Sequence, residues 1–202
     1  EAEVRGRWPF LKTNDLVAPA HEPDSGYADP NLTNGSYAKA AQAKGAEFIL
    51  DTEVNGLQLR SGRVREVTTS HGTFEAPVVI NCAGPWGARV ARWAGVEVPI
   101  NSCRVQVAFF RRPTGYTDEH PVVADFTTAS YWRPETGGLT LVGLIDPSEL
   151  NHVVDPDSYN ERVGLDFVAD AGERLVRRFP AMEKSASASG YAGLYAITPD
   201  WH

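Results

Sequence analysis

The spacing of apolar positions predicts one helix in this chain, and capping residues predict another. Residues 29–45 start with Asp29-Pro30, an N-cap residue followed by proline at the first helical position, and end at Lys44-Gly45, a basic last turn before a glycine. Residues 164–180 carry apolar side chains at every fourth position, namely Phe167, Ala171, Leu175 and Phe179. Because this spacing puts the side chains on one face of a helix, we expect the second helix to cover a sheet.

Short apolar runs separated by glycine turns predict strands. A strand in residues 46–54 and a buried strand in residues 77–82 enclose a β-meander with hairpin turns at Ser61-Gly62 and His71-Gly72. Further strand-like runs lie beyond Pro99, and they read CRVQVAFFRR, PVVADF, SYWRP, GLTLVGLI and SGYAGLYAIT. The first 28 residues are rich in turn formers and predict loops.

These elements predict a mixed fold, α/β or α+β, in two parts. The character of the sequence changes near Pro99, so we place the boundary between residues 1–98 and residues 99–202. The first part combines helices, strands and the β-meander. The second part is a mainly antiparallel sheet covered by helices.

Composition and charge exclude several classes of protein. Hydrophobic residues make up 42% of the chain and the formal net charge is -7, which argues for a globular protein and against binding to nucleic acid or to an anionic membrane. No apolar run reaches the roughly 20 residues of a membrane span, and the start of the chain does not resemble a signal peptide, so we expect a cytoplasmic protein. Cys82 and Cys103 are expected to be buried free thiols. The histidines show no metal-ligand spacing, and no metal site is expected.

The stretch NCAGPWGARVARWAG, residues 81–95, predicts a strand, a tight turn at Gly84 and a helix. A glycine at such a bend lets an anionic ligand approach main-chain N–H groups. The same residues also suit a simple strand-to-helix connection, and this reading remains open.

Four segments in order resemble one family of flavoenzymes. They are GYADPNLTNGSYAKAAQAKGAEFILDTEV, VVINCAGPWGARVARWAGVEVPI, YWRPETGGLTLVG and GYAGLYAITPDWH. Together they resemble the FAD-dependent amine and amino-acid oxidoreductases of the D-amino-acid oxidase/sarcosine oxidase superfamily. The resemblance implies that residues 1–98 are part of an FAD-binding domain and that residues 99–202 are a substrate-binding domain.

The same resemblance identifies the chain as the middle portion of a longer enzyme. Enzymes of this family begin with a strand and a G-x-G-x-x-G turn, and they continue past the Thr-Pro-Asp segment; the sequence contains neither part. We therefore expect the chain by itself to bind no FAD. Strand edges left without partners are expected to favour a dimer.

The resemblance also implies the residues of the site. Those near the cofactor are Val54, Ala83, Gly84 and Trp86. Those near the substrate are Tyr131, Arg133, Tyr195, Arg104 and Gln106. Tyr131 and Arg133 alternate along a strand and so share a sheet face, where a hydroxyl and a guanidinium can orient a substrate carboxylate. Several of these residues also have a simpler structural explanation. Trp86 can be an apolar anchor for its helix, and Val54 an ordinary strand residue. Tyr131 can be a packed tyrosine, and Arg133 a surface arginine.

Two positions bear on the flavin chemistry. Monomeric sarcosine oxidases attach the flavin through a cysteine at the position of Gly193, so the resemblance implies non-covalent FAD there. Their oxygen-activating lysine aligns with Thr140, which leaves a dehydrogenase as an alternative to an oxidase.

The function implied is oxidation of the C–N bond of a small amino acid or N-methyl amine, such as sarcosine, dimethylglycine or glycine, by hydride transfer to FAD. Two alternatives remain open. The same fold can act on glycerol 3-phosphate or a 2-hydroxy acid, and a non-catalytic binding or interaction module can keep the sheet.

Overall fold

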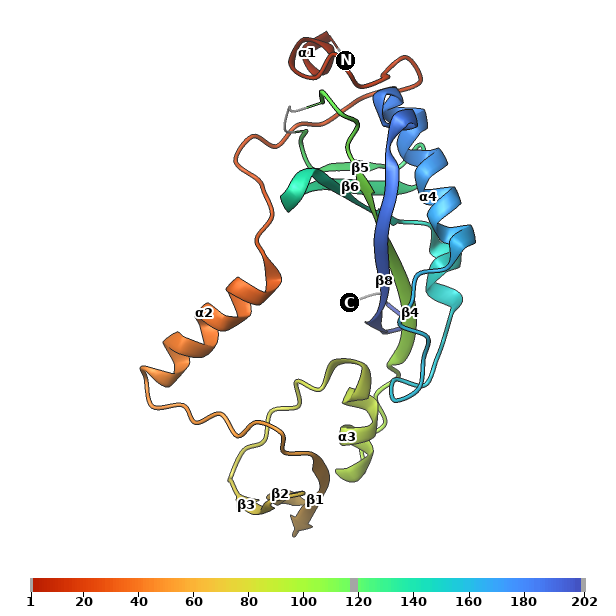
Figure 1. Ribbon diagram of the computed structural model, residues 1–202. Helices are drawn as coiled ribbons and strands as arrows, with labels where there is room; N and C mark the ends of the chain where they lie inside the picture. The colour runs from red at the N-terminus through yellow and green to blue at the C-terminus, as the bar shows by residue number, and fades with distance from the viewer. Residues whose placement is uncertain (1, 117–119, 201–202) are drawn as a thin grey trace. The chain divides into compact units, whose positions relative to one another are not determined.

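The computed structural model describes residues 2–116 and 120–200, and the chain divides into two compact units (Figure 1). Unit 1 comprises Glu1–Ser25 and Ser102–Tyr195, and unit 2 comprises Gly26–Asn101 and Ala196–His202. The break after Asn101 lies near the expected boundary at Pro99. The first 25 residues, however, group with the unit that follows this break. The assignment of residues 1–98 to the cofactor and 99–202 to the substrate stays a prediction.

A five-stranded sheet in the order β5-β6-β7-β4-β8 forms the centre of unit 1. Its strands are β4 (Asn101–Arg111), β5 (Val123–Asp125), β6 (Ser130–Glu135), β7 (Leu139–Leu144) and β8 (Ala186–Ile197). The pairs β5–β6, β6–β7 and β4–β7 are antiparallel. The register sets Tyr131 of β6 opposite Gly143 of β7, and Gly143 opposite Val107 of β4.

Helix α4 (Leu165–Arg178) packs against this sheet (Figure 1). Its buried apolar residues Phe167, Ala171 and Leu175 are those that the four-residue spacing predicts. They form one core with side chains from three strands, including Ala108, Phe110, Trp132 and Val142. The predicted mixed fold, with an antiparallel sheet covered by a helix, is confirmed.

The N-terminal segment also contributes to the core of unit 1. Helix α1 (Ala2–Arg7) comes first, and Leu11 is then buried in the cluster against α4, with Trp8 and Phe10 packed on it. The Phe10 ring lies 4.8 Å from that of Phe179. The first 28 residues are loop-rich as expected, with α1 as their one helix in the described residues, but the packing of Trp8, Phe10 and Leu11 into the core was not predicted.

A buried cluster of charged side chains, the buried ion cluster, links the N-terminal segment to α4. The Arg178 side chain is 2% exposed, and its Nε donates to Oδ2 of Asp125 at 2.7 Å. Its Nη1 donates to Oδ1 of Asp15 at 2.6 Å and to the carbonyl oxygen of Lys12. Asp125 in turn accepts hydrogen bonds from the backbone N–H groups of residues 127 and 128.

Unit 2 contains the predicted first helix and the β-meander. Helix α2 spans Pro30–Gln42, and the Asp29 side chain caps it by accepting a hydrogen bond from the N–H of Leu32 at 2.8 Å. The meander consists of β1 (Val54–Arg60), β2 (Arg63–Thr69) and β3 (Gly72–Glu75), which pair antiparallel in sequence order. The 3-10 helix η1 (Gly84–Trp86) leads into α3 (Gly87–Trp93). The other 3-10 helices in the described residues belong to unit 1: η2 (Thr136–Gly138), η3 (Pro147–Asn151) and η4 (Pro180–Lys184).

Two predicted strands are missing from unit 2. Residues 46–53 and 77–82 form no strand, and apolar side chains in them are exposed, with Val78 at 72% and Ile80 at 81%. A strand requires a neighbour for its N–H and C=O groups, and no strand in the described part of the chain pairs with these residues. For the same reason Cys82 is exposed, contrary to expectation, whereas Cys103 is a buried free thiol as expected.

None of the helices in the described ranges has the length and apolar character that a bilayer crossing requires.

Candidate functional site

The five-stranded sheet presents two faces of different character. Side chains alternate along a strand, so Trp132 of β6 enters the core under α4 while its neighbours Tyr131 and Arg133 lie on the opposite face. We call this second surface the open face. It carries Tyr131, Arg133 and Glu135 of β6, Phe109 of β4, and Tyr191 and Tyr195 of β8.

The Tyr131 ring lies across β7 at a glycine. A Cβ placed on Gly143 would lie 2.3 Å from both Cζ and Oη of Tyr131, far inside van der Waals contact. Since Gly143 is the register partner of Tyr131, the ring extends sideways over the neighbouring strand instead of standing out from the sheet. The hydroxyl therefore points toward the middle of the open face.

Tyr195 lies near Tyr131 on the open face, although its strand, β8, is separated from β6 by β7 and β4. Burial raises the pKa of the Tyr131 hydroxyl, and the nearby Tyr195 raises it further. The Tyr131 side chain is half-buried, whereas Tyr195 is 49% exposed. Two hydroxyls thus come together on the open face, and Tyr195 is the more exposed of the two residues.

Further aromatic side chains flank this pair. The rings of Phe109 and Tyr191 lie 6.1 Å apart at an interplanar angle of 39°. Tyr191 is 51% exposed. The open face thus combines apolar ring surface with a small number of polar groups, which is the usual composition of a small-molecule site.

Arg133 shares this face but has a partner within its own strand. Its Nη1 lies 2.8 Å from Oε2 of Glu135, and both side chains are roughly a quarter exposed. A substrate carboxylate would have to compete with Glu135 for the guanidinium. The role of Arg133 in substrate binding stays a prediction.

Arg104 and Gln106 lie on the other face. They are in the same strand phase of β4 as Ala108 and Phe110, which pack under α4. The Arg104 guanidinium donates to the carbonyl oxygens of Asn160 at 2.7 Å and Arg162 at 2.6 Å, and Oε1 of Gln106 accepts from the N–H of Gly164 at 2.8 Å. The structure thus uses both side chains to hold the segment before α4, and it does not bring them together with Tyr131.

Thr140, which the resemblance aligns with an oxygen-activating lysine, also lies under α4. It is fully buried, and its Oγ1 is 2.8 Å from Nε2 of His120. Burial lowers the pKa of His120. On β7 the open face instead receives Leu139, Leu141 and Gly143, so Thr140 does not share the face of Tyr131.

The glycine turn of unit 2 is braced by an asparagine. Nδ2 of Asn81 donates to the carbonyl oxygen of Gly87 at 2.9 Å, and its Oδ1 accepts from the N–H of Ala83 at 3.1 Å. Gly84 has a φ of +50°, and a Cβ there would meet nothing within 4 Å. Trp86 is 37% exposed. A left-handed glycine with open space around it lets a ligand reach the main chain.

The residues of this turn fit an additional contact with FAD, and they do not form the loop that binds its pyrophosphate. The accessible turn at Ala83 and Gly84 offers main-chain groups, and the exposed Trp86 offers an apolar ring. The glycine-rich loop that would hold the pyrophosphate does not occur in the sequence. Val54 begins β1, opposite Thr69, and is partly exposed; its contact with the cofactor stays a prediction.

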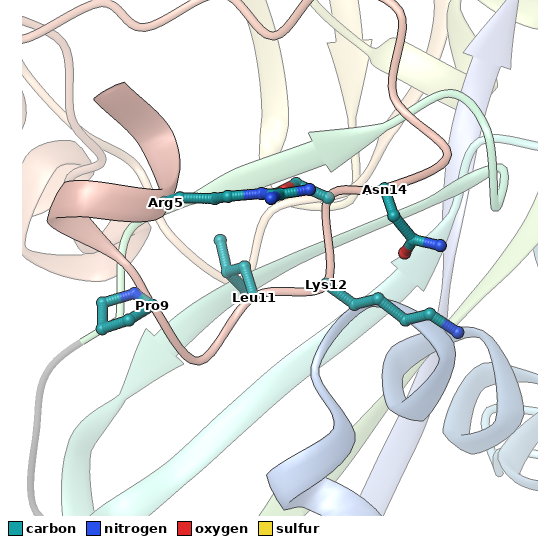
Figure 2. A pocket seen from close by; sticks show the side chains of 6 residues that line it. Arg5, Pro9, Leu11, Lys12 and Asn14 are labelled. Carbon is teal, nitrogen blue, oxygen red and sulfur yellow. The ribbon is translucent and has the colours of Figure 1, made fainter. Parts of the chain in front are cut away.

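A shallow hollow of about 360 Å³ lies along the N-terminal segment of unit 1 (Figure 2). Its lining residues are Arg5, Pro9, Leu11, Lys12, Thr13 and Asn14. The Arg5 side chain crosses it, and its Nε donates to Oγ1 of Thr13 at 2.8 Å (Figure 2). None of the predicted site residues lines this hollow, so we assign it no part in the candidate site.

Sequence reasoning missed Gly143, Tyr191 and Asn81. The first two had a usable signal, since Gly143 interrupts the apolar run of a strand and Tyr191 precedes Tyr195 in the same strand phase. The bracing role of Asn81 depends on where residues 83 and 87 turn, which no local pattern specifies.

Comparison with known proteins assigns the chain to a family. The family model "DAO: FAD dependent oxidoreductase" matches residues 1–202. Mitochondrial sarcosine dehydrogenase of Mus musculus is 30% identical over 206 residues, which cover 98% of this chain and 22% of the relative. Monomeric sarcosine oxidase of Arthrobacter sp. is 26% identical over 208 residues, which cover 100% of this chain and 52% of the relative.

A solved structure is similar to this chain in fold. L-proline dehydrogenase from P. horikoshii superimposes with a TM-score of 0.86 at 23% identity, covering 98% of this chain and 52% of that one. The chain thus spans between about a fifth and about half of the length of these proteins. The match of the family model along the whole chain shows that it belongs to the FAD dependent oxidoreductase family.

Proposed function

We propose that the protein oxidises the C–N bond of a small amino acid or N-methyl amine. The observation that carries the proposal is the pair of hydroxyls of Tyr131 and Tyr195 on the open face of the sheet. The two tyrosines come from strands at different positions in the sheet, and they converge beside aromatic side chains. A non-catalytic module has no need of such a pair.

The pair suits the carboxylate of an amino acid. Tyr195 is half exposed, so its O–H can donate to a carboxylate oxygen, and the Tyr131 hydroxyl beside it can donate a second hydrogen bond. Hydrogen bonds to an ionised acceptor are stronger than those between neutral groups. The raised pKa of Tyr131 keeps this hydroxyl protonated, so that it can donate to a carboxylate without repelling it.

The names of the relatives point to substrates of this kind. Sarcosine dehydrogenase, dimethylglycine dehydrogenase and glycine oxidase each act on an amine nitrogen next to a carbon that bears a carboxylate. We extend this substrate class, an α-amino acid with a small or N-methylated nitrogen, to the present protein.

Bound FAD would accept the two electrons removed from the substrate C–N bond. Residues of this chain that would contact it are Ala83, Gly84 and Trp86 at the accessible turn. The residues of the open face orient the substrate by its carboxylate, and the flanking rings of Phe109 and Tyr191 offer apolar surface to the rest of it.

The alternative of a phosphate-bearing substrate has less support. It requires several free cations, but Arg104 holds backbone carbonyls on the other face and Arg133 is paired with Glu135. A 2-hydroxy acid keeps the carboxylate, and it differs from an amino acid only at the reacting group.

The experiment is anaerobic reduction of the flavin in the complete protein loaded with FAD. Sarcosine, dimethylglycine, glycine, proline and D-amino acids are compared with 2-hydroxy acids and glycerol 3-phosphate, and loss of the flavin absorbance is recorded. Bleaching by at least one amino acid is expected. The proposal fails if no amine or amino acid bleaches the flavin, or if a hydroxy acid alone does so.

A further inference from the structure

Tyr131 and Tyr195 can meet only by reaching across the sheet. In the strand order, β7 and β4 separate β6, which carries Tyr131, from β8, which carries Tyr195. Side chains that stand upright on such separated strands are too far apart for a hydrogen bond. At least one of the two rings must therefore lean over its neighbouring strand.

Gly143 is where the Tyr131 ring leans. A Cβ on this residue would be 2.3 Å from Cζ, 2.3 Å from Oη and 2.4 Å from Cε1 of Tyr131. No ordinary side chain tolerates these distances, and an alanine would have to displace the ring. Pairing of residues 130–135 with residues 139–144 fixes the register on both sides of this contact, so the strands cannot slide to relieve it.

The backbone of Gly143 does not itself require glycine. Its φ lies outside the left-handed region, unlike that of Gly84 or Gly137, so another residue could adopt the same conformation. The requirement for glycine comes from the ring alone. Gly193 of β8 provides the contrast, because a Cβ there would meet nothing within 4 Å.

We propose that Gly143 is a positioning residue for the substrate site, which acts by leaving room for the Tyr131 ring to lie across β7 and bring its hydroxyl to Tyr195. The role in substrate binding rests on the function proposed above. The role in placing Tyr131 does not, because it follows from the contact itself.

A methyl group at position 143 has a defined consequence. The Tyr131 ring must rotate away from β7, and its hydroxyl then leaves both its covered position and Tyr195. Its pKa falls toward the ordinary tyrosine value, since burial and the contact with Tyr195 are what raise it. The Tyr131 hydroxyl then no longer lies beside Tyr195, so the substrate carboxylate loses one of its two hydrogen-bond donors and binding weakens.

The test compares Gly143→Ala with Gly193→Ala in the complete FAD-loaded protein. Tyrosinate absorbance is followed up to about pH 11, one unit above the ordinary tyrosine pKa of about 10. Each protein is measured with and without Tyr131→Phe, and the difference isolates Tyr131. We expect Tyr131 to ionise in this range in Gly143→Ala, but not in the parent protein or in Gly193→Ala.

Steady-state kinetics provide the second measurement. For an amino acid that reduces the flavin, Gly143→Ala should raise KM about tenfold with a smaller change in kcat, as expected for the loss of one hydrogen bond to the substrate. The flavin spectrum should not change. Gly35→Ala, in α2 at a position where a Cβ would meet nothing within 4 Å, is the kinetic control and should keep both constants. A glycine that matters for stability alone would change neither the titration of Tyr131 nor KM.

A double variant covers the case in which Gly143→Ala folds poorly. If the methyl group collides with the Tyr131 ring, Tyr131→Ala should remove the collision, so Gly143→Ala should cost little stability in that background. An equal loss with and without the ring would overturn the proposal, as would an unchanged titration of Tyr131. If no amine reduces the parent flavoprotein, the proposed function fails, while the titration still decides the role of Gly143.

Discussion

Replacement of Arg178 by methionine would remove the cation from the buried ion cluster of unit 1. Methionine keeps the length and apolar stem of the side chain, so the packing under α4 is largely preserved. What changes is the charge. Asp125, whose side chain is 3% exposed, would lose the group that donates to its Oδ2 at 2.7 Å.

The expected loss follows from the burial of both partners. Burial raises the pKa of Asp125, but hydrogen bonds from Arg178 and Thr128 more than offset this effect, so the pKa lies below its ordinary value and the carboxylate is charged. Removal of one partner from a buried ion pair typically costs about 3–5 kcal/mol, because the remaining charge is left uncompensated. For a protein of this size, that loss corresponds to a fall in Tm of roughly 6–20 °C.

Thermal and urea unfolding, followed by circular dichroism, measure this loss. Arg177→Met is the matched control, because Arg177 is the adjacent arginine of the same helix, is 61% exposed and lies 3.9 Å from Asp15. It should change the free energy of unfolding by no more than about 0.5 kcal/mol. Adding Asp125→Asn to Arg178→Met should recover part of the loss, since the orphaned charge is then gone. A loss of less than about 1 kcal/mol in Arg178→Met would refute the reasoning.

Three further predictions concern the site, a buried histidine and the core. Tyr195→Phe should lower kcat/KM for an amino acid about tenfold or more, as expected for a hydrogen bond to a charged group, with the FAD content unchanged; an unaltered kcat/KM would contradict the proposed contact. Burial lowers the pKa of His120 below 6.5, so the unfolded chain takes up a proton more readily, and stability should be highest above about pH 6.5 and fall as the pH decreases toward the folded pKa. Urea unfolding at several pH values should show that His120→Gln flattens this dependence, and an unchanged dependence would contradict the assignment to His120. Leu175→Ala in the core should cost about 2–5 kcal/mol in urea unfolding, whereas Leu165→Ala, at a position 86% exposed on the same helix, should cost less than about 1 kcal/mol; equal losses would contradict the assigned core.

Elements with strong local signals could be predicted from the sequence. The capping residue Asp29 and the four-residue spacing of the second helix each specify a helix without help from distant residues, and both helices form where expected. The hairpin turn at Ser61-Gly62 uses left-handed backbone at both positions, with φ of 52° and 72°, which the glycine signals.

Elements that depend on a partner could not be predicted in the same way. The apolar run at Val78–Ile80 reads as a buried strand, but a strand forms only where another strand offers hydrogen bonds, and the described part of the chain offers none there. Conversely, Trp8, Phe10 and Leu11 lack any periodic pattern, and their place in the core depends on α4, far away in the sequence.

The residues of the candidate site could also be grouped only in part from the sequence. Alternation along β6 correctly puts Tyr131 and Arg133 on one face, because period two is a property of the strand itself. Which face of β4 matches that of β6 depends on the register between strands, so the grouping of Arg104 and Gln106 with Tyr131 could not be checked before the structure. The ion pair of Arg133 with Glu135, two residues along the strand, was accessible to the same reasoning.

The attachment of the N-terminal segment to α4 has a consequence for synthesis of the chain. Lys12 and Arg178, which hydrogen-bond in the folded protein, are 166 residues apart. At roughly 5–20 residues per second, the ribosome needs about 8–33 s after making the first of them to produce the second. Trp8, Phe10 and Leu11 leave the ribosome long before α4 exists to cover them. Throughout that interval the nascent chain presents apolar side chains that a chaperone can bind, and closure of unit 1 must wait until translation has passed its last helix.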